Sequence, residues 1–287
     1  MRQSLSSAAI LTLPLLLGSC QKVPDLGALG AELKKFLPTI AYDSLDVKSI
    51  DFKRIQADVV LSVDNPNPVE LGLNTLDYAL KVGGSDLLTG STTAGLTMGA
   101  SSKSELRVPI SVVYADIGDV LSATKGKDEI GWSLSGEMGV KTPIGVAPLP
   151  VNVSGTMPAL RTPSIKFDKI RVEELKILEN KASLAVDLAV TNDQASALSL
   201  ADVQYGLKLQ SNEVANGRVD SLGSAAAGTS TVTLPVDLSL TGLGQTLLDV
   251  LTNKGDIKAD LSASMTVQTP FGPVPLSIDE GGQVKVL

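Results

Sequence analysis

The side chains that most often carry chemistry in enzymes are sparse in this sequence. The 287 residues contain no histidine and one cysteine, Cys20. Histidine is the commonest general base and metal ligand, and a serine nucleophile without it would need a lysine as its base. No serine and lysine stand in a pattern typical of such a pair. We therefore expect no catalytic residue in this chain.

Neighbouring carboxylates are the other candidates for chemistry. Asp116 with Asp119, or Glu173 with Glu174, could act as an acid–base pair or bind calcium. Neither pair has the spacing that calcium-binding loops require, so solvated surface positions explain them better. A lone cysteine also excludes an intrachain disulfide and a zinc site built from several cysteines. The sequence thus predicts no metal site and no cofactor.

Cys20 follows a segment that is typical of export. Arg2 supplies a positive charge, and residues 8–17 form a short apolar run. A transmembrane helix needs roughly 20 apolar residues, so this run is too short to be one. The tetrapeptide Leu17-Gly18-Ser19-Cys20 resembles a bacterial lipobox, in which the cysteine is lipidated and begins the mature protein. The resemblance implies a signal peptide over residues 1–19 and a lipid anchor, such as palmitate, on Cys20.

A lipid anchor on Cys20 implies a place in the cell envelope, with the membrane as a partner. An aspartate directly after such a cysteine often marks retention in the inner membrane, and this chain has Gln21 there. The resemblance therefore favours the outer membrane, facing the periplasm or the cell surface. Two alternatives stay open for Cys20, an ordinary cleavage site and a buried free thiol.

A tether is expected after the anchor, over residues 20–44. Within it, residues 24–38 carry leucines at approximate helical spacing, which indicates a short helix that ends at Pro38. This helix either stands free in the tether or packs on the first domain.

The composition limits the remaining choices of partner. With 24 basic and 31 acidic residues the formal net charge is −7, and an acidic protein repels phosphate backbones, so we expect no nucleic acid. Hydrophobic residues make up 43% and aromatic residues 3%, which indicates folded domains with aliphatic cores. The length suits two domains.

An internal repeat organises the chain beyond the tether. Thr142-Pro143-Ile144-Gly145 recurs 127 residues later as Thr269-Pro270-Phe271-Gly272. The same offset relates three further pairs: Tyr78 and Tyr205, Gly90 and Gly217, and Met138 and Met265. Repetition at this distance predicts two copies of one domain, over residues 45–160 and 165–287.

Each copy has the apolar pattern of a β domain. Alternating apolar residues of the first copy correspond to alternating apolar residues of the second. Those of the first are Ala57, Val59, Leu61 and Val63, and those of the second are Leu184, Val186, Leu188 and Val190. Period-two alternation is typical of a strand with one buried face. Short helical patterns stand at residues 117–121 and 247–251. We predict a mainly β chain with two tandem antiparallel β-sandwich domains, each with one short helix.

A proline-rich turn follows the first alternating strand, at Asp64-Asn65-Pro66-Asn67-Pro68. Proline lacks a backbone donor, so the two prolines end the sheet ladder, and the asparagine side chains can hydrogen-bond nearby backbone. We interpret the motif as a structural turn. The alternative is a polar patch that binds a ligand or partner. The second copy reads Asn192-Asp193-Gln194-Ala195 and lacks both prolines.

This motif, with the Tyr78 strand after it, resembles the late-embryogenesis-abundant type 2 family, also called the water-stress and hypersensitive-response (WHy) domain. Gly72 and Gly90 also stand where that family tends to place glycines. The resemblance covers residues 45–157 well and residues 170–279 more weakly, because the second copy has lost the prolines. It implies a folded, fibronectin- or immunoglobulin-like sandwich, a role in desiccation and other stress, and no catalytic activity.

Together these observations predict a non-enzymatic cell-envelope lipoprotein of this class, associated with the response to desiccation and water stress. Two alternatives stay open. One is a module that binds a lipid tail or another hydrophobic ligand, and the other is a structural adaptor for an envelope protein.

Overall fold

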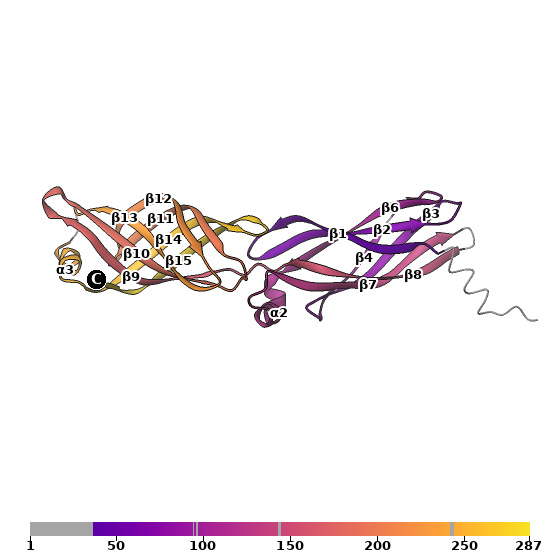
Figure 1. Cartoon of the computed structure of the whole chain (residues 1–287), viewed down its shortest axis with the longest axis horizontal. Coiled ribbons are helices and arrows are strands. Elements are labelled where there is room, and N and C mark those ends of the chain that lie inside the picture. The colour runs from indigo at the N-terminus through magenta and orange to yellow at the C-terminus, as the bar shows by residue number, and fades with distance from the viewer. Residues whose placement is uncertain (1–36, 94, 96, 143–144, 242–243) are drawn as a thin grey trace, which may run out of the picture. The chain divides into compact units, whose positions relative to one another are not determined.

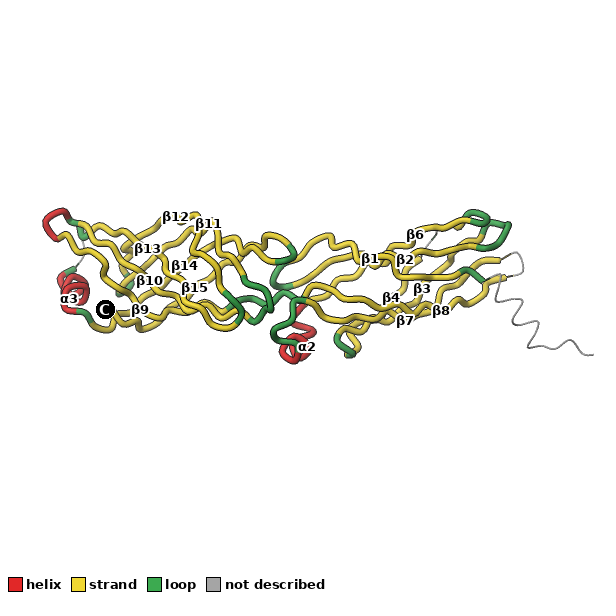
Figure 2. The backbone as a smooth tube through the Cα atoms, in the orientation of Figure 1, coloured by secondary structure: helices red, strands yellow, loops and turns green. Residues whose placement is uncertain are grey.

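The computed structural model describes residues 37–287, except residues 94, 96, 143–144 and 242–243. The predicted signal peptide and Cys20 lie outside the described residues, as does the predicted tether helix up to residue 36. Strands make up most of the described chain, and the helices are short (Figure 2).

The first repeat consists of two antiparallel sheets (Figure 1). One sheet has the order β1-β2-β6, and the other has the order β4-β3-β7-β8 with β5 paired to β3. The strands are β1 (Thr39–Ile50), β2 (Arg54–Asn65), β3 (Leu71–Val82), β4 (Ser85–Thr93), β5 (Thr97–Met98), β6 (Ser102–Val113), β7 (Glu129–Thr142) and β8 (Gly145–Pro158). The inner faces of the two sheets carry aliphatic side chains, which form the core of this repeat.

The second repeat repeats this strand order within one sheet, β12-β11-β14-β15-β9-β10-β13. Its strands are β9 (Ser164–Lys176), β10 (Lys181–Asn192), β11 (Leu198–Leu209), β12 (Asn212–Ala225), β13 (Gly228–Ser239), β14 (Gly255–Thr269) and β15 (Gly272–Val286). A short parallel pairing of β15 with β9, at Lys285–Lys169 and Val286–Ile170, joins the two halves. This repeat is therefore a sandwich that is partly closed on itself.

The predicted alternation corresponds to burial in both repeats. Val59, Leu61 and Val63 of β2 are fully buried, and Val186 and Val190 are their buried equivalents in β10. Burying one such side chain stabilises the fold by about 1.5–3 kcal/mol. The repeated alternating pattern therefore provides an aliphatic core in each of the two repeats. The prediction of a mainly β chain with two tandem sandwich repeats is confirmed.

The helices lie where the sequence places them. After a 3-10 turn (η1, Tyr114–Ile117), helix α2 spans Gly118–Ala123 in the first repeat, and helix α3 spans Gln245–Asn253 in the second. A further 3-10 turn, η2, covers Ile177–Glu179. Within the part of the chain that the structure describes, no helix has the length and apolarity needed to cross a membrane.

The start of the first domain differs from the prediction. The tether was expected to extend to residue 44, but β1 begins at Thr39, which pairs with Asp64 of β2. Register shifts between Tyr42 and Ser44, and again between Val47 and Ser49, interrupt this strand. Such irregularities break the period-two pattern, which is why the sequence alone placed these residues in the tether.

Candidate functional site

The predicted motif forms a compact turn after β2, which we call the first turn (Asn65–Val69). Asn65 is fully buried, and its Nδ2 donates to the carbonyl oxygens of Val69 at 3.0 Å and Gly99 at 2.9 Å. Its Oδ1 accepts from the backbone N of Asn67 at 3.0 Å and from the Asn67 Nδ2 at 2.9 Å. Side-chain hydrogen bonds therefore close this turn, and the two asparagines point inward.

The prolines of the first turn have the opposite placement. Pro66 and Pro68 are exposed and lie between the end of β2 and the start of β3, outside the sheet ladder. Val69 beside them is 47% exposed. The structure thus brings all four motif residues together, with a polar interior and an apolar exterior. The interpretation as a structural turn stays a prediction, and Asn65→Ala tests it.

The second turn (Asn192–Ser196) has counterparts of three of these four hydrogen bonds and lacks the prolines. The Asn192 Nδ2 donates to the carbonyl oxygens of Ser196 at 2.9 Å and Ala225 at 3.2 Å. Its Oδ1 accepts from the backbone N of Gln194 at 2.9 Å. The first asparagine of the motif therefore closes the turn in both repeats, and this closure does not depend on proline.

A buried carboxylate joins three strands of the second repeat. Asp187 of β10 is 4% exposed and accepts from Arg171 Nε at 2.9 Å and Nη2 at 3.1 Å. Thr233 of β13 donates to the same carboxylate at 2.7 Å. The hydrogen bonds from Arg171 hold the pKa of Asp187 below its usual value, so this carboxylate stays ionised and connects the strands rather than acting as a general acid.

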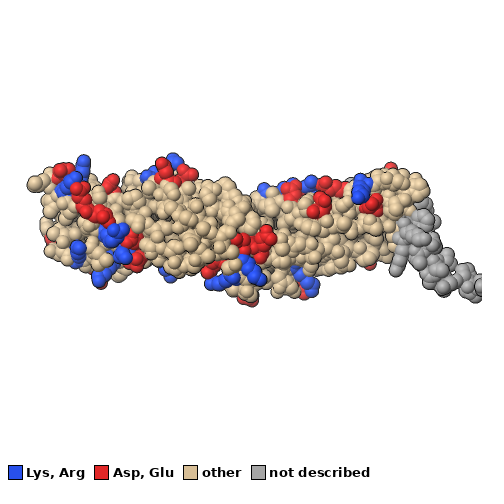
Figure 3. Space-filling model, in the orientation of Figure 1, with Lys and Arg blue, Asp and Glu red and all other residues tan. Residues whose placement is uncertain are grey.

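The other carboxylate candidates are exposed. Asp116 and Asp119 lie in η1 and α2, and Glu173 and Glu174 lie on β9. Glu173 pairs with Arg171, and Glu174 pairs with Lys176 at 2.9 Å. On the face shown in Figure 3, acidic and basic side chains lie close together in mixed groups. In the ranges described, no three acidic, cysteine or histidine side chains gather closely enough to hold a metal ion.

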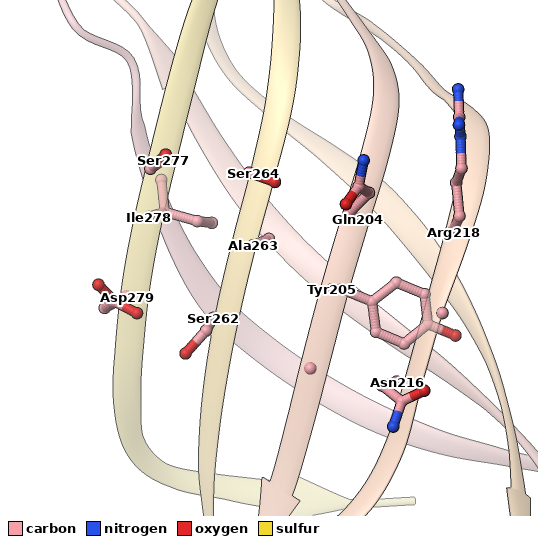
Figure 4. Close-up of a pocket in the computed structure, with 12 residues that line it drawn as sticks. Gln204, Tyr205, Asn216, Arg218, Ser262, Ala263, Ser264, Ser277, Ile278 and Asp279 are labelled. Atoms are coloured by element: carbon pink, nitrogen blue, oxygen red, sulfur yellow. The ribbon is translucent and has the colours of Figure 1, made fainter.

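A shallow hollow of about 850 Å³ lies on the outer face of the second repeat, across β11, β12, β14 and β15 (Figure 4). Its labelled lining residues are Gln204, Tyr205, Asn216, Arg218, Ser262, Ala263, Ser264, Ser277, Ile278 and Asp279. Small side chains produce the depression, and its hydroxyl and amide groups can form hydrogen bonds with a solute.

The Tyr205 ring covers one side of this hollow. Its hydroxyl donates to the Pro235 carbonyl oxygen at 3.3 Å, and a Cβ at Gly217 would lie 2.8 Å from that hydroxyl. Tyr78 and Gly90 repeat the arrangement in the first repeat, with a Cβ at Gly90 only 2.6 Å from the ring. The paired tyrosines and glycines thus serve cross-strand packing, because a glycine leaves room for the ring.

Comparison with family models identifies one family. The model of the late embryogenesis abundant protein family (LEA type 2) matches residues 60–155 and 187–280. No curated protein sequence matches the chain. Among solved structures, one titled a late embryogenesis abundant protein is 20% identical, with a TM-score of 0.33, and the match covers 43% of this chain and 71% of that one.

Two further structures match less than half of this chain. A protein from Arabidopsis thaliana is 16% identical with a TM-score of 0.36, over 43% of this chain and 82% of that one. A protein from Archaeoglobus fulgidus is 8% identical with a TM-score of 0.33, over 42% of this chain and all of that one. The family assignment rests on the two matched regions, which coincide with the two sandwich repeats. The chain therefore belongs to the late embryogenesis abundant type 2 family and carries two tandem copies of its domain.

Proposed function

We propose that this chain is a non-enzymatic lipoprotein of the cell envelope that takes part in the response to desiccation and water stress. The observation that carries the proposal is the pair of family matches at residues 60–155 and 187–280. The lipobox-like Leu17-Gly18-Ser19-Cys20 supports the envelope location. One acyl chain gives only marginal membrane binding, and bacterial lipoproteins typically carry several chains on one cysteine.

Buried polar groups of both repeats have hydrogen-bond partners within the chain. Asn65, Asn192 and Asp187 are each at most 4% exposed, and all are hydrogen-bonded to other residues. A buried polar group without a partner costs about 1–3 kcal/mol, so these partners stabilise the fold. Among the described residues, Gln194 Nε2 is the buried side-chain atom left without a partner.

Desiccation survival tests the stress role. Deletion of the gene is expected to lower survival after drying, and wild-type protein from a plasmid is expected to restore it. Deletion cells that survive drying as well as their parent, at several drying rates, would refute the role in stress.

Cell fractionation tests the anchor. Cys20→Ser is expected to leave the protein unprocessed or released from the membrane, whereas Ser19→Ala keeps a small residue before the cysteine and serves as the matched control. A Cys20→Ser protein that still fractionates as mature, detergent-requiring material would show that the anchor is not at Cys20.

A further inference from the structure

The second turn contacts the first repeat, and residues 38–287 form one compact unit. Lys125, just after helix α2, pairs through its Nζ with the Asp193 carboxylate at 2.9 Å. The backbone N of Gly126 donates to the Asp193 carbonyl oxygen at 3.0 Å. These contacts come from the loop between α2 and β7, so a single loop of the first repeat faces the second turn.

Asp128 of the same loop contacts the other half of the second turn. Its Oδ1 accepts from the backbone N of Ala195 at 2.9 Å and of Ser196 at 3.2 Å. The Ser196 hydroxyl donates to the other carboxylate oxygen of Asp128. Charge-assisted bonds of this kind are roughly twice as strong as neutral ones, so Asp128 fixes the turn firmly.

Arg161 connects the same two parts from the linker between the repeats. Only 8% of this residue is exposed, and its Nη1 donates to the Gln194 Oε1 at 3.0 Å. Its Nη2 donates to the carbonyl oxygens of Leu121 at 3.0 Å and Thr124 at 2.7 Å, where α2 ends. Carbonyl groups at a helix C-terminus attract a cation, which accounts for a buried guanidinium at this place.

The differences between the two turns coincide with these contacts. Asp193, Gln194 and Ala195 stand where the first turn has Pro66, Asn67 and Pro68. The Asp193 side chain contacts Lys125 of the first repeat, and the Gln194 side chain contacts Arg161 of the linker. Ala195 contributes a backbone N–H to Asp128 that a proline would lack. Every departure from the motif therefore supplies a bond to the first repeat or to the linker.

We infer that the second turn is an interaction surface whose partner is the first repeat of the same chain. Asp128 and Arg161 hold it there, so the two repeats move as one body. Without such contacts, adjacent domains joined by a short linker are expected to move relative to one another. The residues that stand in place of the prolines thus provide contacts between the repeats. The first turn has the prolines, and they are exposed.

A motif exchange tests this inference in the chain without its first 20 residues. The variant Asp193→Pro, Gln194→Asn, Ala195→Pro gives the second turn the residues that stand at the same positions in the first turn. Spin labels on Thr89→Cys and Ser277→Cys, both exposed, report the distance between the repeats. The wild-type turn is expected to give a narrow distance distribution, and the exchange is expected to broaden it about twofold or more.

The reverse exchange is the matched control. Pro66→Asp, Asn67→Gln, Pro68→Ala alters the first turn alone and is expected to leave the width unchanged. An exchanged second turn that retains its β content and still gives the narrow distribution would overturn the inference. If that variant fails to fold, Asp128→Ala is used instead, with Asp116→Ala as its control, because Asp128→Ala removes the acceptor and leaves the sequence of the second repeat intact. A distribution as narrow for Asp128→Ala as for Asp116→Ala would again refute the inference.

Discussion

Replacing Asn65 with alanine removes four hydrogen bonds from the first turn. The asparagine amide donates to the Val69 and Gly99 carbonyl oxygens, and its oxygen accepts from two nitrogen atoms of Asn67. Because Asn65 is fully buried, water does not reach the space that its side chain occupies. The substitution therefore tests whether the motif is primarily structural.

The expected cost follows from the number of hydrogen bonds and from their burial. Asn65 is fully buried and Asn67 is 8% exposed. An intramolecular hydrogen bond typically contributes about 0.5–1.5 kcal/mol, so the loss of the four bonds should destabilise the first repeat by about 3 kcal/mol. Pro66→Ala with Pro68→Ala should cost only about 1 kcal/mol, through greater freedom of the unfolded chain.

Urea unfolding can report the two repeats separately. Trp132 is the only tryptophan of the chain and lies in the first repeat, so its fluorescence follows that repeat, whereas far-ultraviolet circular dichroism follows both. Asn65→Ala should lower the tryptophan midpoint strongly, and Asn192→Ala is the matched variant in the second repeat. A cost below that of the double proline variant, together with lost stress protection, would refute the structural interpretation and indicate a binding site.

Three further predictions concern charge and packing. Burial raises the pKa of Tyr114 from 10.0 to about 12, so between these pH values the unfolded chain loses its proton first and stability falls by up to about 3 kcal/mol. Tyr114→Phe should remove this part of the alkaline transition, measured by circular dichroism. Because Arg171 lowers the pKa of Asp187, the carboxylate stabilises the fold above pH 3.8 and this contribution is lost as pH falls through the lowered pKa. Asp187→Asn should therefore flatten the acid limb of the stability curve. Gly136→Ala would place a Cβ 2.1 Å from the Asp77 carbonyl oxygen. It should lower the free energy of unfolding by about 3 kcal/mol, measured by urea unfolding.

Much of the fold could be predicted from the sequence because its signals are local. Alternating burial follows from the pleat of a strand. The spacing of Val59, Leu61 and Val63 therefore identifies the buried face of β2 even when the neighbouring strands are unknown. The repeat then supported the prediction in a second copy. Strand β1 was partly missed, because its register shifts remove the periodicity on which such a prediction depends.

The first turn shows how far local reasoning extends. The hydrogen bond from Asn65 to Val69 spans four residues and belongs to a pattern that the residue types indicate. The bond from the same amide to Gly99 spans 34 residues and depends on how β2 and β6 pair. That Asn65 is buried, and that Pro66 is exposed, was decided by this pairing.

By itself, the sequence determined two aliphatic sandwich repeats, a motif turn in each and the absence of histidine chemistry. Only the tertiary structure decided what the altered second turn contacts. Asp128 lies 67 residues from Ala195 along the chain, and Arg161 lies 33 residues from Gln194. No periodicity connects residues at such distances, because their contact depends on how the two repeats meet. In the sequence, the only sign of this contact is that the second copy lacks both prolines. The structure gives the reason: the backbone N–H of Ala195, which a proline would lack, donates to Asp128.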